Sequence, residues 1–255
     1  MRVYLIRHGQ SAGNVNYFDN IGDPSRAKDH HVPDPELTDK GHEQARRLGE
    51  HMAHPEGEPV RHPWLDEAER APASHGLTHV YCSLMLRSIQ TATYLAEACG
   101  LPLVAHMDLF EKEGIFAIDD DGQKVGLPGP GRDYFAERFP QLQLPDDMNP
   151  DGWYNRPFET DEMFFERTKR VLPAFEEMHG GTDDCIALVT HGDTIDQIIN
   201  DFSGATRRDA NYENHWVANW AFHNTSVTRI DYVGQTKTVV YTNQFQHLPP
   251  NLLSW

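Results

Sequence analysis

Short runs of consecutive apolar residues alternate along this chain with longer segments whose apolar residues recur every three or four positions. Residues 3–6 (VYLI) and 185–190 (CIALVT) are two of the short runs. Continuous apolar runs of this length are typical of strands that are buried on both faces of a sheet. Residues 77–83 (LTHVYCS) and 101–106 (LPLVAH) predict two further short strands.

Two segments between these strands have the apolar spacing of amphipathic helices. In residues 39–53 and again in residues 85–99, the apolar side chains fall on one helical face. The second segment is followed by Gly100, where we expect the left-handed residue that commonly ends a helix.

A longer helical pattern covers residues 160–179, with Thr160 or Asp161 as the expected N-cap. Pro173 lies inside this pattern. Because proline lacks a backbone N–H and clashes with the preceding turn, we expect it to kink or divide the helix.

The order of the elements predicts the fold class. The apolar run that begins at residue 185 leads into a helix, and residues 224–232 and 236–243 predict a final pair of strands. Such alternation favours an α/β fold of three layers, α/β/α, with a central, mostly parallel sheet. We interpret residues 1–255 as a single domain of this kind. Irregular insertions over the active site are expected at 54–77 and 115–157, where turn-forming residues are dense.

The composition narrows the class of protein. The chain has 39 acidic and 22 basic residues, for a formal net charge of −17. This balance disfavours nucleic acid and anionic membranes as partners. No apolar run approaches the ~20 residues of a membrane span, and no signal-peptide pattern opens the chain. The three cysteines form no CxxC pair, so we expect free thiols and a cytoplasmic protein.

Two of the predicted strands end in the same way. The first runs into Arg7, His8 and Gly9, and the strand at 185–190 runs into His191 and Gly192. Ligands of open α/β sheets bind at the carboxyl ends of strands, and a glycine there lets the backbone approach a ligand closely. A single histidine at the end of a strand is usually structural, but two strands that both end in His-Gly favour a pair of reactive histidines.

Five segments in order resemble the histidine phosphatase superfamily, the group that includes the cofactor-dependent phosphoglycerate mutases. They are RHGQSAGN from residue 7, LTDKGHEQA from 37, VYCSLMLRSIQTA from 80, LVTHG from 188 and NTSVTRI from 224. The segments span nearly the whole chain, so the resemblance implies the fold of that family throughout.

The resemblance also implies a role for each matching residue. His8 would attack phosphorus and carry the phosphoryl group as a phosphohistidine. Arg7, Arg87 and His191 would surround that group and neutralise its oxygens. Arginine suits this task because its planar guanidinium binds phosphate through two N–H groups. The expected substrate-binding residues beside them are Gly9, Asn14 and Gly192.

The leaving group needs a proton donor, which we seek in residues 108–116 (DLFEKEGIF). In one branch of the family the acid stands in a Leu-x-Glu-x-x-Gly setting, which implies Glu111, with Gly114 as the glycine. Glu113 is the alternative. The same carboxyl would later deprotonate the water that hydrolyses the phosphohistidine, and partial burial would help by raising its pKa.

We therefore predict a metal-independent phosphomonoesterase of the histidine acid phosphatase type, whose partner is a small phosphorylated metabolite. The alternatives are a phosphoglycerate-mutase-like phosphotransferase and a non-catalytic protein that binds phosphorylated ligands. No cofactor and no metal are expected, because DDDG at 119–122 lacks the spacing of a calcium loop. GHEQA likewise has Arg46 where the zinc motif needs a second histidine. The sequence is compatible with a homodimer and does not predict the oligomeric state.

The part of the substrate beyond its phosphate is harder to predict. Trp153, Tyr154 and Arg156 come together in DGWYNRPFET. We expect them to stack on or clamp the substrate, and the alternative is that the aromatic side chains only pin this loop to the core.

Overall fold

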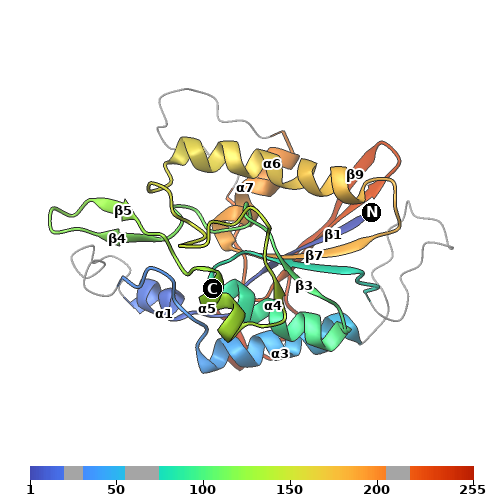
Figure 1. The fold of residues 1–255 in the computed structure, drawn as a ribbon. Coiled ribbons are helices and arrows are strands. Elements are labelled where there is room, and N and C mark those ends of the chain that lie inside the picture. The colour runs from blue at the N-terminus through green and yellow to red at the C-terminus, as the bar shows by residue number, and fades with distance from the viewer. Residues whose placement is uncertain (20–30, 55–74, 205–218) are drawn as a thin grey trace.

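The computed structural model describes residues 1–19, 31–54, 75–204 and 219–255 (Figure 1). Its centre is a seven-stranded sheet with the order β6-β3-β2-β7-β1-β8-β9. The strands are β1 (Arg2–Arg7), β2 (His79–Cys82), β3 (Leu103–Ala105), β6 (Leu142–Gln143), β7 (Cys185–Thr190), β8 (Val227–Val233) and β9 (Thr236–Gln244). The first five in spatial order are parallel, whereas β8 and β9 are antiparallel to their neighbours. The predicted, mostly parallel sheet is confirmed.

Helices cover both faces of this sheet and complete the three predicted layers (Figure 1). One face carries α3 (Asp39–Ala53) and α4 (Leu86–Cys99), and the other carries α6 (Asp161–His179) and α7 (Gly192–Phe202). Because successive side chains of a strand point to opposite faces, β1 supplies both cores. Tyr4 and Ile6 pack in the core under α3 and α4, and Val3 and Leu5 pack in the core under α6 and α7.

The helices begin and end at the residues that their sequences indicate. The Thr38 hydroxyl accepts a hydrogen bond from Gly41 N and caps α3. Gly100 ends α4 in the left-handed region, with φ of +65°. Of the two candidates for the N-cap of α6, Thr160 is the residue found there, and its hydroxyl accepts from Met163 N.

Pro173 does not divide α6, which continues from Asp161 to His179. Its ring lies on the exposed side of the helix, where water can satisfy the carbonyl group that loses its N–H partner. Val171 and Phe175, on the buried side, hold the helix against the sheet on both sides of the proline. Of the two outcomes expected at Pro173, a kink or a division, the division is contradicted, because tertiary packing outweighs one missing backbone hydrogen bond.

The region expected to be irregular contains several short elements. β4 (Phe116–Ile118) and β5 (Lys124–Gly126) form an antiparallel hairpin away from the main sheet, at the left of Figure 1. The elements that the apolar pattern did not predict are this hairpin, α1 (Ala12–Asp19), α5 (Arg132–Arg138), β6 and the 3-10 turn η2 (Pro250–Leu252). Most of them have too few residues to show a period. The expected excursion at 54–77 lies largely outside the described residues.

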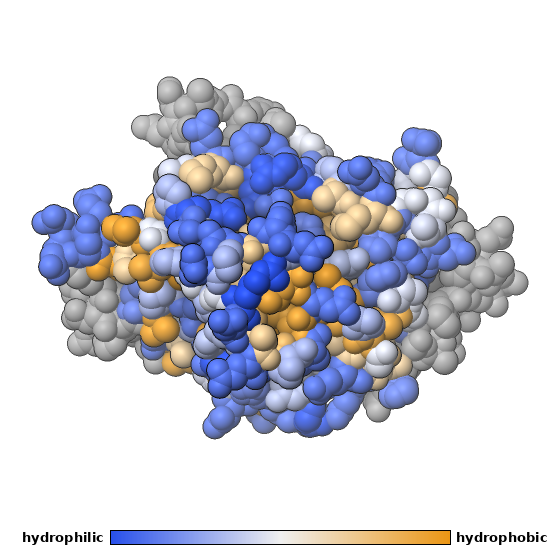
Figure 2. Space-filling view, in the orientation of Figure 1, coloured by the Kyte–Doolittle hydropathy of each residue, from blue (hydrophilic) through white to orange (hydrophobic). Residues whose placement is uncertain are grey.

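Figure 2 shows a face made mostly of hydrophilic residues, with smaller apolar groups between them. Within the described ranges, none of the helices combines the length and apolar character needed to cross a bilayer.

Candidate active site

The carboxyl ends of three parallel strands bring the predicted residues together. Arg7, at the end of β1, is in register with Thr190, at the end of β7. The next residues, His8 and His191, are therefore neighbours, and their ring centroids lie 5.0 Å apart. His8 N donates to Thr190 O at 2.9 Å, and this hydrogen bond holds the end of β1 against the end of β7.

The hydrogen bonds of His8 select one tautomer. Its Nδ1 lies 2.6 Å from the carbonyl oxygen of Gly9, an acceptor, so Nδ1 carries the proton. Its Nε2 accepts a hydrogen bond from Arg87 Nε at 3.2 Å. Burial, followed by the charges of Arg87 and Arg7, lowers the pKa of His8 well below the usual value. The imidazole is therefore neutral, with its Nε2 lone pair directed at a guanidinium group.

Arg87 is a buried cation and Arg7 is a partly buried one. Arg7 donates through NH1 to Phe222 O, while its Nε has no hydrogen-bond partner among the described residues. Burial lowers the pKa of Arg7 to about 10, so the guanidinium stays charged at neutral pH. Arg87 NH1 lies 3.7 Å from Asp34 Oδ1. Asp34, which our sequence analysis did not single out, thus supplies the carboxyl group nearest to Arg87.

His191 is held by a serine at the end of β2. Its Nε2 lies 2.8 Å from Ser83 Oγ, which also accepts from Met85 N. The serine proton is then available for His191 Nε2, and this arrangement leaves the ring proton on Nδ1. That buried Nδ1 has no partner within the described part of the chain. Burial is the main cause of a pKa of His191 well below its usual value, so His191 is a neutral donor.

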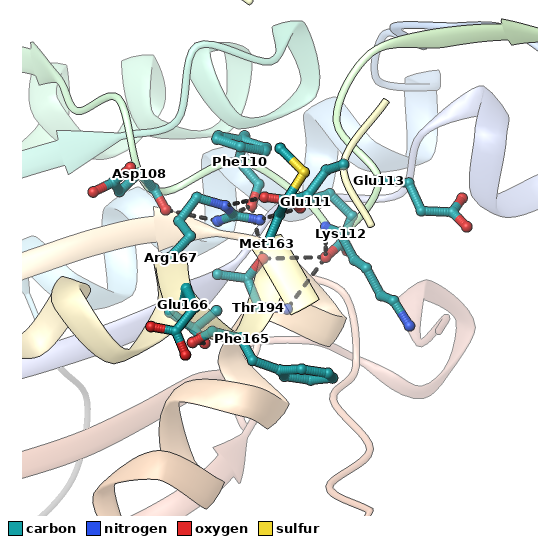
Figure 3. Close-up of polar contacts among 12 residues, drawn as sticks. Asp108, Phe110, Glu111, Lys112, Glu113, Met163, Phe165, Glu166, Arg167 and Thr194 are labelled. Carbon is teal, nitrogen blue, oxygen red and sulfur yellow. Dashed lines mark hydrogen bonds and ion pairs between the residues drawn. The ribbon is translucent and has the colours of Figure 1, made fainter. Parts of the chain in front are cut away.

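Glu111 and Glu113 have different surroundings (Figure 3). Glu111 Oε1 accepts from Lys112 N at 2.9 Å and from the amide and hydroxyl of Thr194, each at 3.2 Å. Glu113 points away from this network and forms an ion pair with Lys124 at 2.5 Å. Of the two candidates, only Glu111 is anchored to the first turn of α7, immediately after His191.

The electrostatic state of Glu111 also fits a proton donor. Burial, followed by the nearby charge of Asp193, raises the pKa of Glu111 to about 7. Asp193, at the start of α7, has its own pKa raised by burial first. Two carboxyl groups in one buried region resist double ionisation. At neutral pH Glu111 is therefore populated in both the acid and the base form.

A buried arginine holds the segment that carries Glu111 (Figure 3). Arg167, on α6, donates through NH1 to the carbonyl oxygens of Asp108 and Phe110 at 2.8 and 2.9 Å. Its other nitrogens bind both carboxylate oxygens of Glu159 at 2.7 and 2.8 Å. The guanidinium carbon also lies 3.6 Å from the centroid of the Phe110 ring. Arg167 therefore positions the backbone directly before Glu111.

Replacing Arg167 with methionine is expected to lower the free energy of unfolding by about 3–5 kcal/mol, because the Glu159 carboxylate is left buried without its partner. Urea unfolding followed by circular dichroism measures the change. Arg170→Met is the matched control. The Arg170 side chain is 60 % exposed and pairs with Asp108 at 3.5 Å, and such exposed pairs contribute about 0–1 kcal/mol to stability. Equal losses in the two variants would contradict the structural role of Arg167.

A cavity of about 360 Å³ opens at this site, and His191, which is fully buried, lies outside its lining. Arg7, His8, Arg87 and Glu111 line it together with Asn14. Asn14 Oδ1 accepts hydrogen bonds from the backbone and side chain of Ser11, at 3.0 and 3.1 Å. These contacts leave the amide protons of Asn14 for a ligand.

The two predicted glycines lie behind the cavity rather than in its lining. A Cβ on Gly9 would lie 2.6 Å from Gly41 O, so this position allows close packing of the loop on the start of α3. The Gly9 amide already donates to Thr91 Oγ1 at 2.9 Å. A Cβ on Gly192 would lie 3.4 Å from Arg7 Nε. Their roles here are backbone packing and room for the Arg7 side chain.

The expected contact of Trp153 and Tyr154 with the substrate was wrong. Both side chains are 1 % exposed and pack around Phe110 with ring centroids 5.7 and 5.4 Å away. The Tyr154 hydroxyl donates to backbone carbonyls, including that of Pro157 at 3.2 Å. Arg156 is exposed, donates to Tyr154 O and is not part of the cavity lining. These residues pin their loop to the core, as the alternative interpretation expected.

Several residues of the site were not singled out by the sequence analysis. Asp193 and Thr194 directly follow the LVTHG segment, so their place at the start of α7 was a usable signal. Ser83 likewise ends the β-like segment 77–83. Asp34 and Arg167 had no such signal, because their contacts join segments far apart in the chain.

Comparison with known proteins supports the resemblance. A family model, histidine phosphatase superfamily (branch 1), matches residues 3–71 and 126–244. A probable phosphoglycerate mutase, GpmB, from Enterobacter sp. (strain 638) is 29% identical over 128 residues. That match covers 48% of this chain and 46% of GpmB, so the chain spans about half the length of this curated relative.

Solved structures share the fold at low sequence identity. YhfR of Bacillus stearothermophilus superposes with a TM-score of 0.55 at 21% identity, covering 96% of this chain and 98% of its own. A phosphoserine phosphatase of Entamoeba histolytica, solved with 3-phosphoglyceric acid, gives 0.53 at 16% identity, with coverages of 97% and 99%. The family model covers most of the chain, and the chain therefore belongs to the histidine phosphatase superfamily, branch 1.

Proposed function

We propose that this chain is a phosphomonoesterase that hydrolyses a small phosphorylated metabolite through a phosphohistidine at His8, with no metal ion in the reaction. The observation that carries the proposal is the state of His8. Its Nδ1 proton is bound to Gly9 O, and its Nε2 lone pair meets Arg87. Attack on a phosphoryl group held by arginine needs such a neutral, oriented imidazole.

In the first step, His8 Nε2 forms a bond to phosphorus while the bond from phosphorus to the ester oxygen breaks. Arg87 leaves Nε2 and, with Arg7, binds the phosphoryl oxygens, whose charge His191 Nδ1–H also stabilises. Glu111 in its acid form gives its proton to the departing alkoxide, which leaves as an alcohol. His8 then carries the phosphoryl group.

In the second step, Glu111 is a carboxylate and takes a proton from water. The oxygen of that water bonds to phosphorus as the bond to His8 Nε2 breaks, and inorganic phosphate leaves. The proton on His8 Nδ1 stays on that nitrogen throughout, donated to the carbonyl oxygen of Gly9. A pKa of Glu111 of about 7 suits one group that must act as acid and then as base.

The outer part of the cavity favours substrates with a single anionic group. Beyond the two arginines, Lys112 is the cation that lines it among the described residues, and its Nζ lies 2.8 Å from Asp161 Oδ1. Glu113 and Asp193 add carboxyl groups, and the apolar part of the lining includes Phe116. Two nearby cations that do not line the cavity are already engaged, since Lys124 pairs with Glu113 and Arg132 donates to the carbonyl oxygen of Met148.

A panel of phosphometabolites, assayed for inorganic phosphate with EDTA present, tests the proposal. We expect turnover of compounds with one phosphate and a kcat/KM at least about tenfold lower for bisphosphates, which corresponds to about 1.4 kcal/mol. Turnover that requires an added divalent ion would refute the metal-independent reaction.

The same protein, incubated with positional isomers of phosphoglycerate, tests the two alternatives. Isomer exchange faster than phosphate release would identify a phosphotransferase of the mutase type. Binding of inorganic phosphate without turnover of any panel member would identify a non-catalytic binding protein. Either result would overturn the proposal.

A further inference from the structure

A second cluster of ionisable side chains lies at the other end of the sheet from His8. It consists of His79, His179 and Asp184, whose candidate ligand atoms all lie within 4.8 Å of one another. His79 begins β2, His179 ends α6, and Asp184 directly precedes β7. Ser83, at the active site, is four residues beyond His79, or roughly 13 Å along an extended strand. The cluster is therefore separate from the catalytic residues.

We propose that His79, His179 and Asp184 bind a divalent transition-metal ion such as Zn²⁺. Two imidazoles and one carboxylate are a ligand set that zinc accepts, with a further position left for water. The site is distinct from the reaction, so it is compatible with phosphate release that needs no metal.

Two of the three ligand atoms need little movement to meet one ion, and a rotation of the His79 side chain would bring in the third, which lies within 4.8 Å of both. His179 Nδ1 and Asp184 Oδ2 are 2.8 Å apart, and the rings of His79 and His179 have centroids 4.6 Å apart. Two ligand atoms at ~2.05 Å from a tetrahedral ion are separated by roughly 3.3 Å. The histidine and carboxylate would thus spread by a few tenths of an ångström to admit the ion.

The groups that would support the ligands are already present. The Tyr81 hydroxyl lies 2.9 Å from His179 Nε2. With a metal on Nδ1, the ring proton resides on Nε2 and is donated to this hydroxyl oxygen, an arrangement typical of metal-bound histidine. Thr78 Oγ1 lies 2.8 Å from His79 Nδ1 and orients the second ring.

The position of Asp184 is fixed while the site stays open. Its backbone N donates to Thr182 Oγ1 at 3.0 Å, and Cys185 N donates to Thr78 Oγ1 at 3.0 Å. His179 is 5 % exposed, whereas 28 % of the Asp184 side chain is exposed. An ion can therefore enter beside Asp184 and reach the buried imidazole.

Titration of the metal-free full chain with Zn²⁺, by calorimetry and by competition with a chromogenic chelator, tests the site. His79→Ala and Asp184→Asn are expected to weaken the affinity for the most tightly bound zinc ion at least about tenfold. Tyr81→Phe is expected to weaken it about tenfold. Co²⁺ should give a visible absorption spectrum that both ligand variants lose. Zn²⁺ should also raise the Tm of the unaltered protein.

A control is essential because the chain has 15 histidines. His54→Ala removes an exposed histidine at the end of α3, outside the cluster, and should leave the affinity unchanged. The variants His79→Ala, Asp184→Asn and His54→Ala should all release phosphate at the rate of the unaltered protein. Absence of zinc binding in the unaltered chain, or equal affinity in His79→Ala, would show that His179 and Asp184 make a hydrogen bond and no metal site.

Discussion

Replacing His8 with alanine is expected to reduce phosphate release by on the order of 10⁴–10⁶-fold, the loss typical of removing a catalytic nucleophile. Arg7 and Arg87 remain in this variant, so inorganic phosphate should still bind. The measurement is steady-state phosphate release, together with detection of phosphohistidine in rapidly quenched protein. The unaltered chain should show one labelled histidine, and His8→Ala should show none.

The control for this variant is His42→Ala, which removes a histidine whose Nδ1 contacts Tyr94 Oη at 3.2 Å, away from the cavity. It should retain phosphate release close to that of the unaltered protein. Release that persists in folded His8→Ala would show that another group attacks phosphorus, and the proposed mechanism would then be wrong.

Replacing Glu111 with glutamine is expected to lower kcat for an alkyl phosphate by about 10²–10⁴-fold, the range for loss of a general acid or base. The loss should be smaller for the phosphorylation step with an aryl phosphate, because a phenolate leaves without help from an acid. Hydrolysis still needs the base, so the variant should accumulate phosphohistidine with the aryl substrate. Rapid-quench labelling measures that accumulation.

The pH dependence follows from the raised pKa of Glu111. Because that pKa is about 7, the acid form is lost as the pH rises through about 7, and phosphorylation of His8 should slow over that range. The base form is lost as the pH falls through the same value, so hydrolysis of the phosphohistidine should slow in acid. Single-turnover rates resolve both limbs, and Glu111→Gln should lack them.

Glu113→Gln is the matched control, since it makes the same chemical change two residues away. Its carboxylate is paired with Lys124 and points away from the Glu111 network. Because Glu113 lines the outer cavity, KM can change, but we expect kcat and its pH dependence to be retained. If Glu113→Gln loses activity and Glu111→Gln retains it, the acid would be Glu113.

The nearest residues to the proposed phosphoryl site were predictable because they belong to continuous local patterns. His8 and His191 directly follow β1 and β7, and parallel strands of one sheet end at the same edge. The segment from 80 to 92 placed Arg87 in the first turn after β2. The positions of the two histidines follow from the strand ends, whereas the place of Arg87 in the site followed from the resemblance of that segment to the histidine phosphatase superfamily.

The rim was predicted poorly, since the direction of a side chain in a loop is a property of packing. Trp153 and Tyr154 were expected at the cavity and instead fill the core around Phe110. Trp153 and Tyr154 lie among Gly, Asp and Pro residues, and that sequence setting is compatible with a position at the cavity and with a position in the core. Burial of two large rings is strongly favourable, and this outcome depends on whether the core has room for them.

The longer strands and helices, the mostly parallel sheet and the pair of histidines at its edge were predictable from the sequence, because periodicity and strand ends are local properties. The tertiary structure decided which glutamate meets Thr194, that Asp34 lies beside Arg87, and that Arg167 holds the backbone before Glu111. It also brought His79, His179 and Asp184 together. These contacts join residues from separate elements, and their energy comes from burial and charge that exist only once the layers have packed.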